Sequence, residues 1–164
     1  MPEARREGEP VLSTAVSIDL VTVKGVKYFR GSEGYGYNAT VYIDGKKTAL
    51  AINHGDGGMT FFEYVNPELK VRFQAAAKRW VTSKGREDAF EPEGLFLEAK
   101  LKDLEDQKAK AANAKKGLPI TIICFAGARY AEDAWEKEFY LGVKDEASLK
   151  NALVENKVVE WRRV

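Results

Sequence analysis

YGYNATVYIDGKKTALAINHGDGG (residues 35–58) predicts a β-hairpin that leads into a glycine-rich loop. Asp44 and Gly45 stand between two runs of alternating apolar and polar residues, and a two-residue type I′ turn needs positive φ at both central positions. This turn pairs Ile43 with Lys46 and sets the register of the ladder. Alternation then places six side chains on one face, which are Tyr37, Ala39, Val41, Ile43, Leu50 and Ile52. The same register puts His54 on that face, opposite Tyr35.

The composition limits the classes of protein to which this chain can belong. The chain has 164 residues, with 26 basic against 25 acidic side chains, so no overall charge draws it to nucleic acid or to a membrane. The one cysteine, Cys124, excludes an internal disulfide and fits a reducing compartment. No apolar run approaches the roughly 20 residues of a membrane span, and residues 1–10 lack an apolar signal segment. We therefore expect a cytoplasmic protein without a membrane partner.

The order of predicted elements indicates an α+β fold, with an antiparallel sheet led by the hairpin. Residues 1–10 are polar and predict a disordered tail, and residues 11–164 predict a single domain. Strands are expected over residues 14–23, 37–43, 46–52 and 59–65, and residues 26–29 either extend the first strand or pair with it across Lys24-Gly25. Helices are expected over residues 67–84 and 91–116. A β-β-α-β segment is expected to follow, with strands over 120–125, 135–143 and 158–161 and a helix that begins at 145.

Both central helices have recognisable ends. Asn66 is a typical N-cap and Pro67 a typical first helical residue. The second helix, over residues 91–116, has an apolar seam that starts at Leu97 and thins to alanine at Ala111. We expect this helix to mediate self-association if the protein forms a homo-oligomer.

The glycine-rich loop is the first candidate ligand site. Closely spaced glycines let backbone amides approach a ligand, while an imidazole and a carboxylate lie beside them. The predicted ligand-binding residues are Tyr35, Asn53, His54, Asp56, Gly57 and Gly58. The alternative is a wide turn in which Asn53 and Asp56 bond to their own backbone.

Catalysis has little support in the sequence. His54 and Asp56 form the one acid–base pair that the loop offers. A chain with one histidine and one cysteine cannot assemble the usual zinc sites, and no serine has the context of a catalytic triad. We therefore expect no metal, no cofactor and no catalytic residue.

Aromatic residues mixed with lysines suggest a second candidate site, because such surfaces stack bases and meet phosphates. The set comprises Tyr28, Phe29, Arg30, Tyr35, Tyr37 and Tyr42 with Lys24, Lys27, Lys46 and Lys47. Of these aromatic residues, only Tyr42, with Lys46 and Lys47 nearby in the hairpin, is expected to be exposed enough for such a role. The lysines late in the second helix, residues 108–116, can extend this site, although core packing and a solvated helix end also explain these residues.

The hairpin Val41-Tyr42-Ile43-Asp44-Gly45-Lys46-Lys47 and the loop Asn53-His54-Gly55-Asp56-Gly57-Gly58 resemble a family of small uncharacterised proteins of bacteria and phages. The resemblance covers about a third of the chain. It implies a prokaryotic or phage origin and a hairpin-led α+β fold. It implies no activity and assigns no site residue.

These observations favour a non-catalytic binding protein, with an unidentified protein or small molecule as partner at the glycine-rich loop. A phage-encoded protein acting on a host component fits the resemblance. Two alternatives stay open. One is an accessory protein that binds single-stranded nucleic acid, and the other is a small enzyme that uses His54 and Asp56.

Overall fold

The structure is a computed structural model that describes residues 18–125, 138–158 and 160–164. It confirms the α+β class, because two antiparallel sheets are combined with three α-helices in the described residues. Contacts divide the chain into two compact units, of which the first ends at Leu101 and the second begins at Lys102. This division does not test the expectation that residues 11–164 form a single domain, which stays a prediction. The expected tail, residues 1–10, and residues 14–17 of the first expected strand lie outside the described residues.

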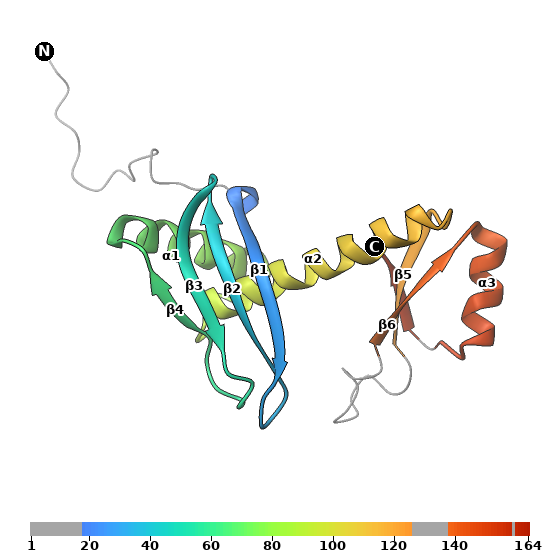
Figure 1. The fold of residues 1–164 in the computed structure, drawn as a ribbon, viewed down its shortest axis with the longest axis horizontal. Coiled ribbons are helices and arrows are strands. Elements are labelled where there is room, and N and C mark those ends of the chain that lie inside the picture. The colour runs from blue at the N-terminus through green and yellow to red at the C-terminus, as the bar shows by residue number, and fades with distance from the viewer. Residues whose placement is uncertain (1–17, 126–137, 159) are drawn as a thin grey trace, which may run out of the picture. The chain divides into compact units, whose positions relative to one another are not determined.

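The first unit contains a four-stranded antiparallel sheet with the order β1-β2-β3-β4 (Figure 1). A short 3-10 helix, Ile18–Leu20, precedes it where the sequence predicts strand. The strands are β1 (Val21–Arg30), β2 (Tyr35–Ile43), β3 (Lys46–Asn53) and β4 (Phe61–Tyr64). The helices α1 (Pro67–Ser83) and α2 (Pro92–Lys115) follow, and the boundary between the units falls within α2.

The hairpin turn forms at the predicted position. Asp44 and Gly45 have φ angles of 48° and 73°, and Ile43 pairs with Lys46. The register farther along the hairpin differs from the prediction, because an irregularity follows Lys47 and leaves Thr48 as an extra residue. Val41 consequently pairs with Ala49 rather than with Thr48.

This bulge exchanges the two faces of β3. Ala49 and Ala51 are fully buried, whereas Leu50 and Ile52, which were expected on the core face, lie on the opposite face. The reason is space: the buried rings of Phe73 and Phe96 fill the core, so small side chains suit the strand that faces them.

The helix α1 begins as predicted. The Asn66 side chain accepts a hydrogen bond from the Leu69 backbone N–H at 2.9 Å, and Pro67 occupies the first turn. The core face of the sheet packs against this helix, where the Phe62 and Phe73 rings lie 5.4 Å apart, and the Phe73 ring in turn lies 5.9 Å from Phe96 at the start of α2. The buried residues of α1 are Leu69, Phe73, Ala76, Ala77 and Val81.

The second unit contains a three-stranded antiparallel sheet with the order β6-β5-β7. Its elements are the end of α2, β5 (Ile120–Phe125), β6 (Glu138–Val143), α3 (Glu146–Glu155) and β7 (Glu160–Arg163). This confirms the expected β-β-α-β segment, in which β7 ends two residues beyond the predicted end at 161. Residue 159 and the expected start of β6 at 135–137 lie outside the described residues. The core cluster comprises Ile122, Cys124, Val143 and Leu149.

Candidate functional site

The glycine-rich loop is closed by its own side chains. The Asn53 Oδ1 atom accepts a hydrogen bond from the Gly55 N–H at 2.9 Å, and the Asp56 Oδ1 atom accepts one from the Gly58 N–H at 3.0 Å. These are the local bonds of the wide-turn interpretation. Two of the predicted ligand-binding side chains thus already hold the turn together.

The glycines of the loop allow a close approach between two backbone segments. The Gly55 carbonyl oxygen accepts a hydrogen bond from the Glu33 N–H at 2.9 Å. A Cβ atom on Gly31 would collide with the Gly55 carbonyl, and one on Gly57, whose φ is 77°, would collide with the Glu33 carboxylate. A Cβ atom on Gly55 would likewise lie 2.6 Å from the Gly36 nitrogen. Packing against the β1–β2 connection therefore accounts for Gly55 without a ligand, and its positive φ accounts for Gly57.

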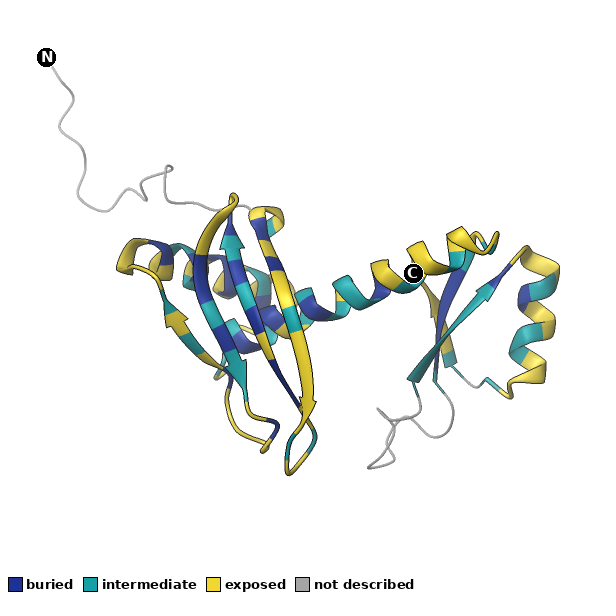
Figure 2. Cartoon of the chain, in the orientation of Figure 1, coloured by how far each residue is buried: buried dark blue, intermediate teal, exposed yellow. Residues whose placement is uncertain are grey.

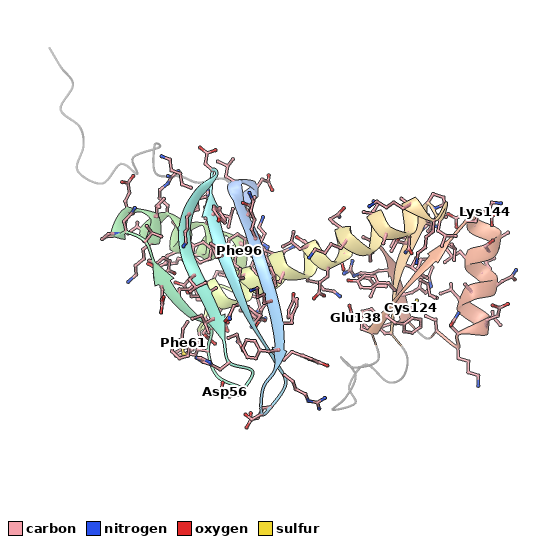
Figure 3. The ribbon with its side chains drawn as sticks, in the orientation of Figure 1. Asp56, Phe61, Phe96, Cys124, Glu138 and Lys144 are labelled. Atoms are coloured by element: carbon pink, nitrogen blue, oxygen red, sulfur yellow. The ribbon has the colours of Figure 1, made fainter. Side chains whose placement is uncertain are left out.

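His54 lies at the rim of the sheet and not within the core. Because Asn53 pairs with Tyr37, the parity of His54 is opposite to the one predicted, and its side chain is exposed. Its ring lies 5.7 Å from the ring of Phe61, and Figure 3 shows Phe61 and Asp56 at the same end of the first unit. The expected site residue Tyr35 opens β2 and is 59% exposed.

Behind His54, a buried polar chain fixes the loop to the sheet. The Tyr37 hydroxyl and the Thr60 Oγ1 atom are 2.9 Å apart, and the Asn53 Nδ2 atom donates to the same Thr60 oxygen at 3.1 Å. Burial raises the pKa of Tyr37 to about 12, so its hydroxyl stays protonated and available for this bond. These bonds tie the start of the loop to the sheet.

The face of the first sheet that points away from α1 and α2 forms a second surface, which we call the outer face. The register assigns it twelve side chains, which are Thr22, Lys24, Lys27, Phe29, Asn38, Thr40, Tyr42, Lys47, Leu50, Ile52, Phe61 and Glu63. Three are aromatic and three are lysines, and Glu63 is the one acid among these described residues. Figure 2 shows exposed positions along β1 and β4 at its two edges.

Contacts on the outer face arrange cations beside rings. The Lys24 Nζ atom lies 5.2 Å from the centroid of the Tyr42 ring, and Tyr42 pairs across the strands with Lys47. The Phe29 ring covers Gly36, where a Cβ atom would collide with it. Phe29 is 38% exposed and Phe61 is 58% exposed.

The structure brings together some of the residues predicted for nucleic-acid binding. Tyr42 and Lys47 are neighbours on the outer face, whereas Lys46 pairs with Ile43 and has the parity of the core face. The lysines late in α2, residues 108–116, belong to the second unit. Phe61 was missed, because the sequence offers only a short aromatic run there and the register of β4 decides which of its rings is exposed.

No protein-family model matches this chain, and no curated protein or solved structure shows significant similarity to it. The resemblance to small bacterial and phage proteins therefore stays a prediction. Across residues 18–125, 138–158 and 160–164, no helix combines the length and apolar content that a membrane span requires. The described residues also contain no cluster of three histidine, cysteine or acidic side chains that could hold a metal ion.

Proposed function

We propose that this protein binds single-stranded nucleic acid on the outer face of its first sheet. The supporting observation is the presence of three aromatic rings and three lysines on one sheet face that α1 and α2 leave open. Its local charge is positive, because Lys24, Lys27 and Lys47 outweigh Glu63, although the whole chain is nearly neutral.

The chemistry of this face suits unpaired bases. Phe29, Tyr42 and Phe61 offer ring faces or edges on which bases stack, and each such contact is typically worth about 1–3 kcal/mol. Leu50 and Ile52 supply an apolar floor between β2 and β4. A duplex hides its base faces, so stacking of this kind selects single strands.

The glycine-rich loop borders the same surface. The His54 ring contacts Phe61, so a nucleic-acid strand that crosses the outer face toward β4 would meet the loop. The proposal therefore joins the two candidate sites into one continuous binding region. In this arrangement the bound nucleic acid ends at the loop, and the rings and lysines of the outer face provide the affinity.

Titration of fluorescently labelled single-stranded DNA and RNA oligomers by anisotropy tests the proposal. Three lysine contacts predict that the logarithm of the affinity falls with the logarithm of the salt concentration with a slope of about −2, since each phosphate contributes roughly 0.7. Replacing Lys24, Lys27 and Lys47 together by Gln should bring the slope close to zero. The matched control is Lys78→Gln, an exposed lysine on α1. Absence of binding at low ionic strength, or an unchanged slope in the triple variant, would refute the proposal.

A second arm of the experiment tests the stacking contacts. Phe61→Ala should weaken binding by roughly 5- to 150-fold at constant salt slope, the equivalent of one lost base–ring contact. Val71→Ala is the control, because Val71 is 61% exposed and lies on α1. Equal affinities for Phe61→Ala and the wild type would remove β4 from the binding face.

A further inference from the structure

The strand β4 forms an edge of the first sheet. Among the described residues it pairs with β3 only, and the Val65 N–H donates to the Thr48 carbonyl at 2.9 Å. Backbone groups alternate in direction along an antiparallel strand. The N–H and C=O groups of Phe62 and Tyr64 therefore point away from β3, toward the open edge.

The two edges of this sheet differ in protection. The strand β1 carries a register shift between Lys24 and Lys27, and bulges and lysines are devices that discourage a strand from pairing with another chain. The strand β4 has neither. Instead, exposed apolar residues gather around it, with Met59 47% exposed, Phe61 58% exposed and Val65 56% exposed. Of the two edges, β4 is the one suited to further pairing.

A groove of about 250 Å³ runs beside this edge. One wall is β4, and the opposite wall comes from Lys70 and Gln74 of α1 and from residues 90–94 at the start of α2. Phe90 lines it and is 88% exposed. A strand added to β4 would lay alternate side chains into this groove, which is the geometry of β-augmentation.

From this geometry we infer that two copies of the chain form a symmetric dimer by antiparallel pairing of their β4 edges. The groove is lined by both signs of charge, by Lys70 of α1 and by Glu91 and Glu93 at the start of α2. A two-fold interface must be complementary to itself, and this distribution allows one copy's lysine to face the other copy's carboxylates. A partner of a single charge would leave one of the two signs unmatched.

The pairing also has a favoured register. With the two-fold axis at Phe62, the outward backbone groups of the two Phe62 residues bond to each other, and Phe61 lies opposite Glu63 of the other copy. An axis at Glu63 would set two carboxylates opposite each other, which is destabilising. The combined sheet would have eight strands, twice the four of one copy, and its two outer faces would be continuous.

Sedimentation equilibrium of the full chain without nucleic acid tests this dimer independently of the proposed function. We expect dimers in the wild type, at least 10-fold weaker association in Phe90→Glu, and no change in the control Val154→Glu. Val154 is 79% exposed and lies on α3, in the second unit. Lys70→Glu should weaken the dimer, and the added change Glu93→Lys should restore it.

Amide hydrogen exchange supplies the second readout. In the wild type, exchange at Phe62 and Tyr64 should slow as the protein concentration rises, since only the dimer bonds these amides. A monomer at all concentrations would overturn the inference. A dimer that tolerates Phe90→Glu and leaves both amides unprotected would also overturn it, and would point to another interface such as the predicted one on residues 91–116.

Discussion

Replacing Asp106 by Ala should destabilise the second unit more than any other single change to a charged residue of α2. The Asp106 side chain is only 7% exposed, and its carboxylate accepts a hydrogen bond from the Tyr140 hydroxyl at 2.6 Å. The Arg162 Nη2 atom donates to its other oxygen at 3.1 Å, and the Lys102 Nζ atom lies 3.7 Å away. The carboxylate thus joins α2 to β6 and β7.

The magnitude follows from these contacts. A hydrogen bond to a charged group contributes about 1.5–3 kcal/mol, which we assign to the bond from Tyr140. The Arg162 side chain is 50% exposed, so water screens its ion pair. Such a screened pair contributes about 0.5 kcal/mol. The total loss expected for Asp106→Ala is about 3 kcal/mol. Burial raises the pKa of Tyr140, so its hydroxyl stays a donor at neutral pH and loses its partner in the variant.

Hydrogen exchange of the β5 amides in the native state measures the free energy of opening of this unit. Asp106→Ala, Tyr140→Phe and the double variant form a cycle whose coupling energy should be about 1.5 kcal/mol. The control is Asp103→Ala, an exposed acid on the same helix, which should change the opening free energy by less than about 0.5 kcal/mol. A coupling energy near zero would show that the carboxylate and the phenol act independently, against the reasoning above.

Three further predictions concern the first unit. Gly36→Ala should cost about 2–3 kcal/mol in urea denaturation, because the new Cβ would collide with the Asn53 carbonyl. Gly94→Ala is the control, because its new Cβ would lie no closer than 3.8 Å to its neighbours, and it should be neutral or stabilising by up to about 1 kcal/mol. Equal costs at the two sites would contradict this. Burial raises the pKa of Tyr37 from 10.0 to about 12, so the unfolded chain releases this proton first and stability should fall between these pH values. Unfolding followed by circular dichroism across that pH range should show a smaller loss of stability in Tyr37→Phe than in the wild type. An identical loss of stability in both proteins would exclude Tyr37 as the cause. Asn66→Ala should lower the free energy of unfolding by about 1 kcal/mol through loss of the α1 cap, and thermal unfolding would detect it.

Local signals in the sequence predicted much of the fold. Asp44-Gly45 placed the turn because only a few residue pairs accept positive φ, and Asn66-Pro67 placed the start of α1 because caps act within one turn of helix. Such local signals could not predict which side chains of β3 face the core. Whether Leu50 or Ala49 turns inward depends on the volume of Phe73, which lies more than twenty residues away in the chain. The alternation pattern alone predicted that the larger residue, Leu50, faces the core.

The candidate site shows the same limit. The Asn and Asp side chains of the glycine-rich loop were predicted either to bind a ligand or to hold the turn, and the second role is the one seen in Asn53 and Asp56. The outer face could not be assembled from sequence, because the bulge at Thr48 decides that Leu50 and Ile52 join Tyr42 there. A one-residue shift in pairing therefore changed which surface presents apolar groups.

Cys124 can report how often the strands of the second unit separate. It is the one thiol of the chain, has no exposed surface, and sits in the central strand β5 between Phe139 and Trp161 on the neighbouring strands. Burial also raises the pKa of this thiol, which keeps it in the unreactive protonated form. An alkylating reagent can therefore modify the native protein only during moments when β5 separates from its neighbours. The rate of labelling, followed by the mass of the intact chain, would time those moments without an introduced probe.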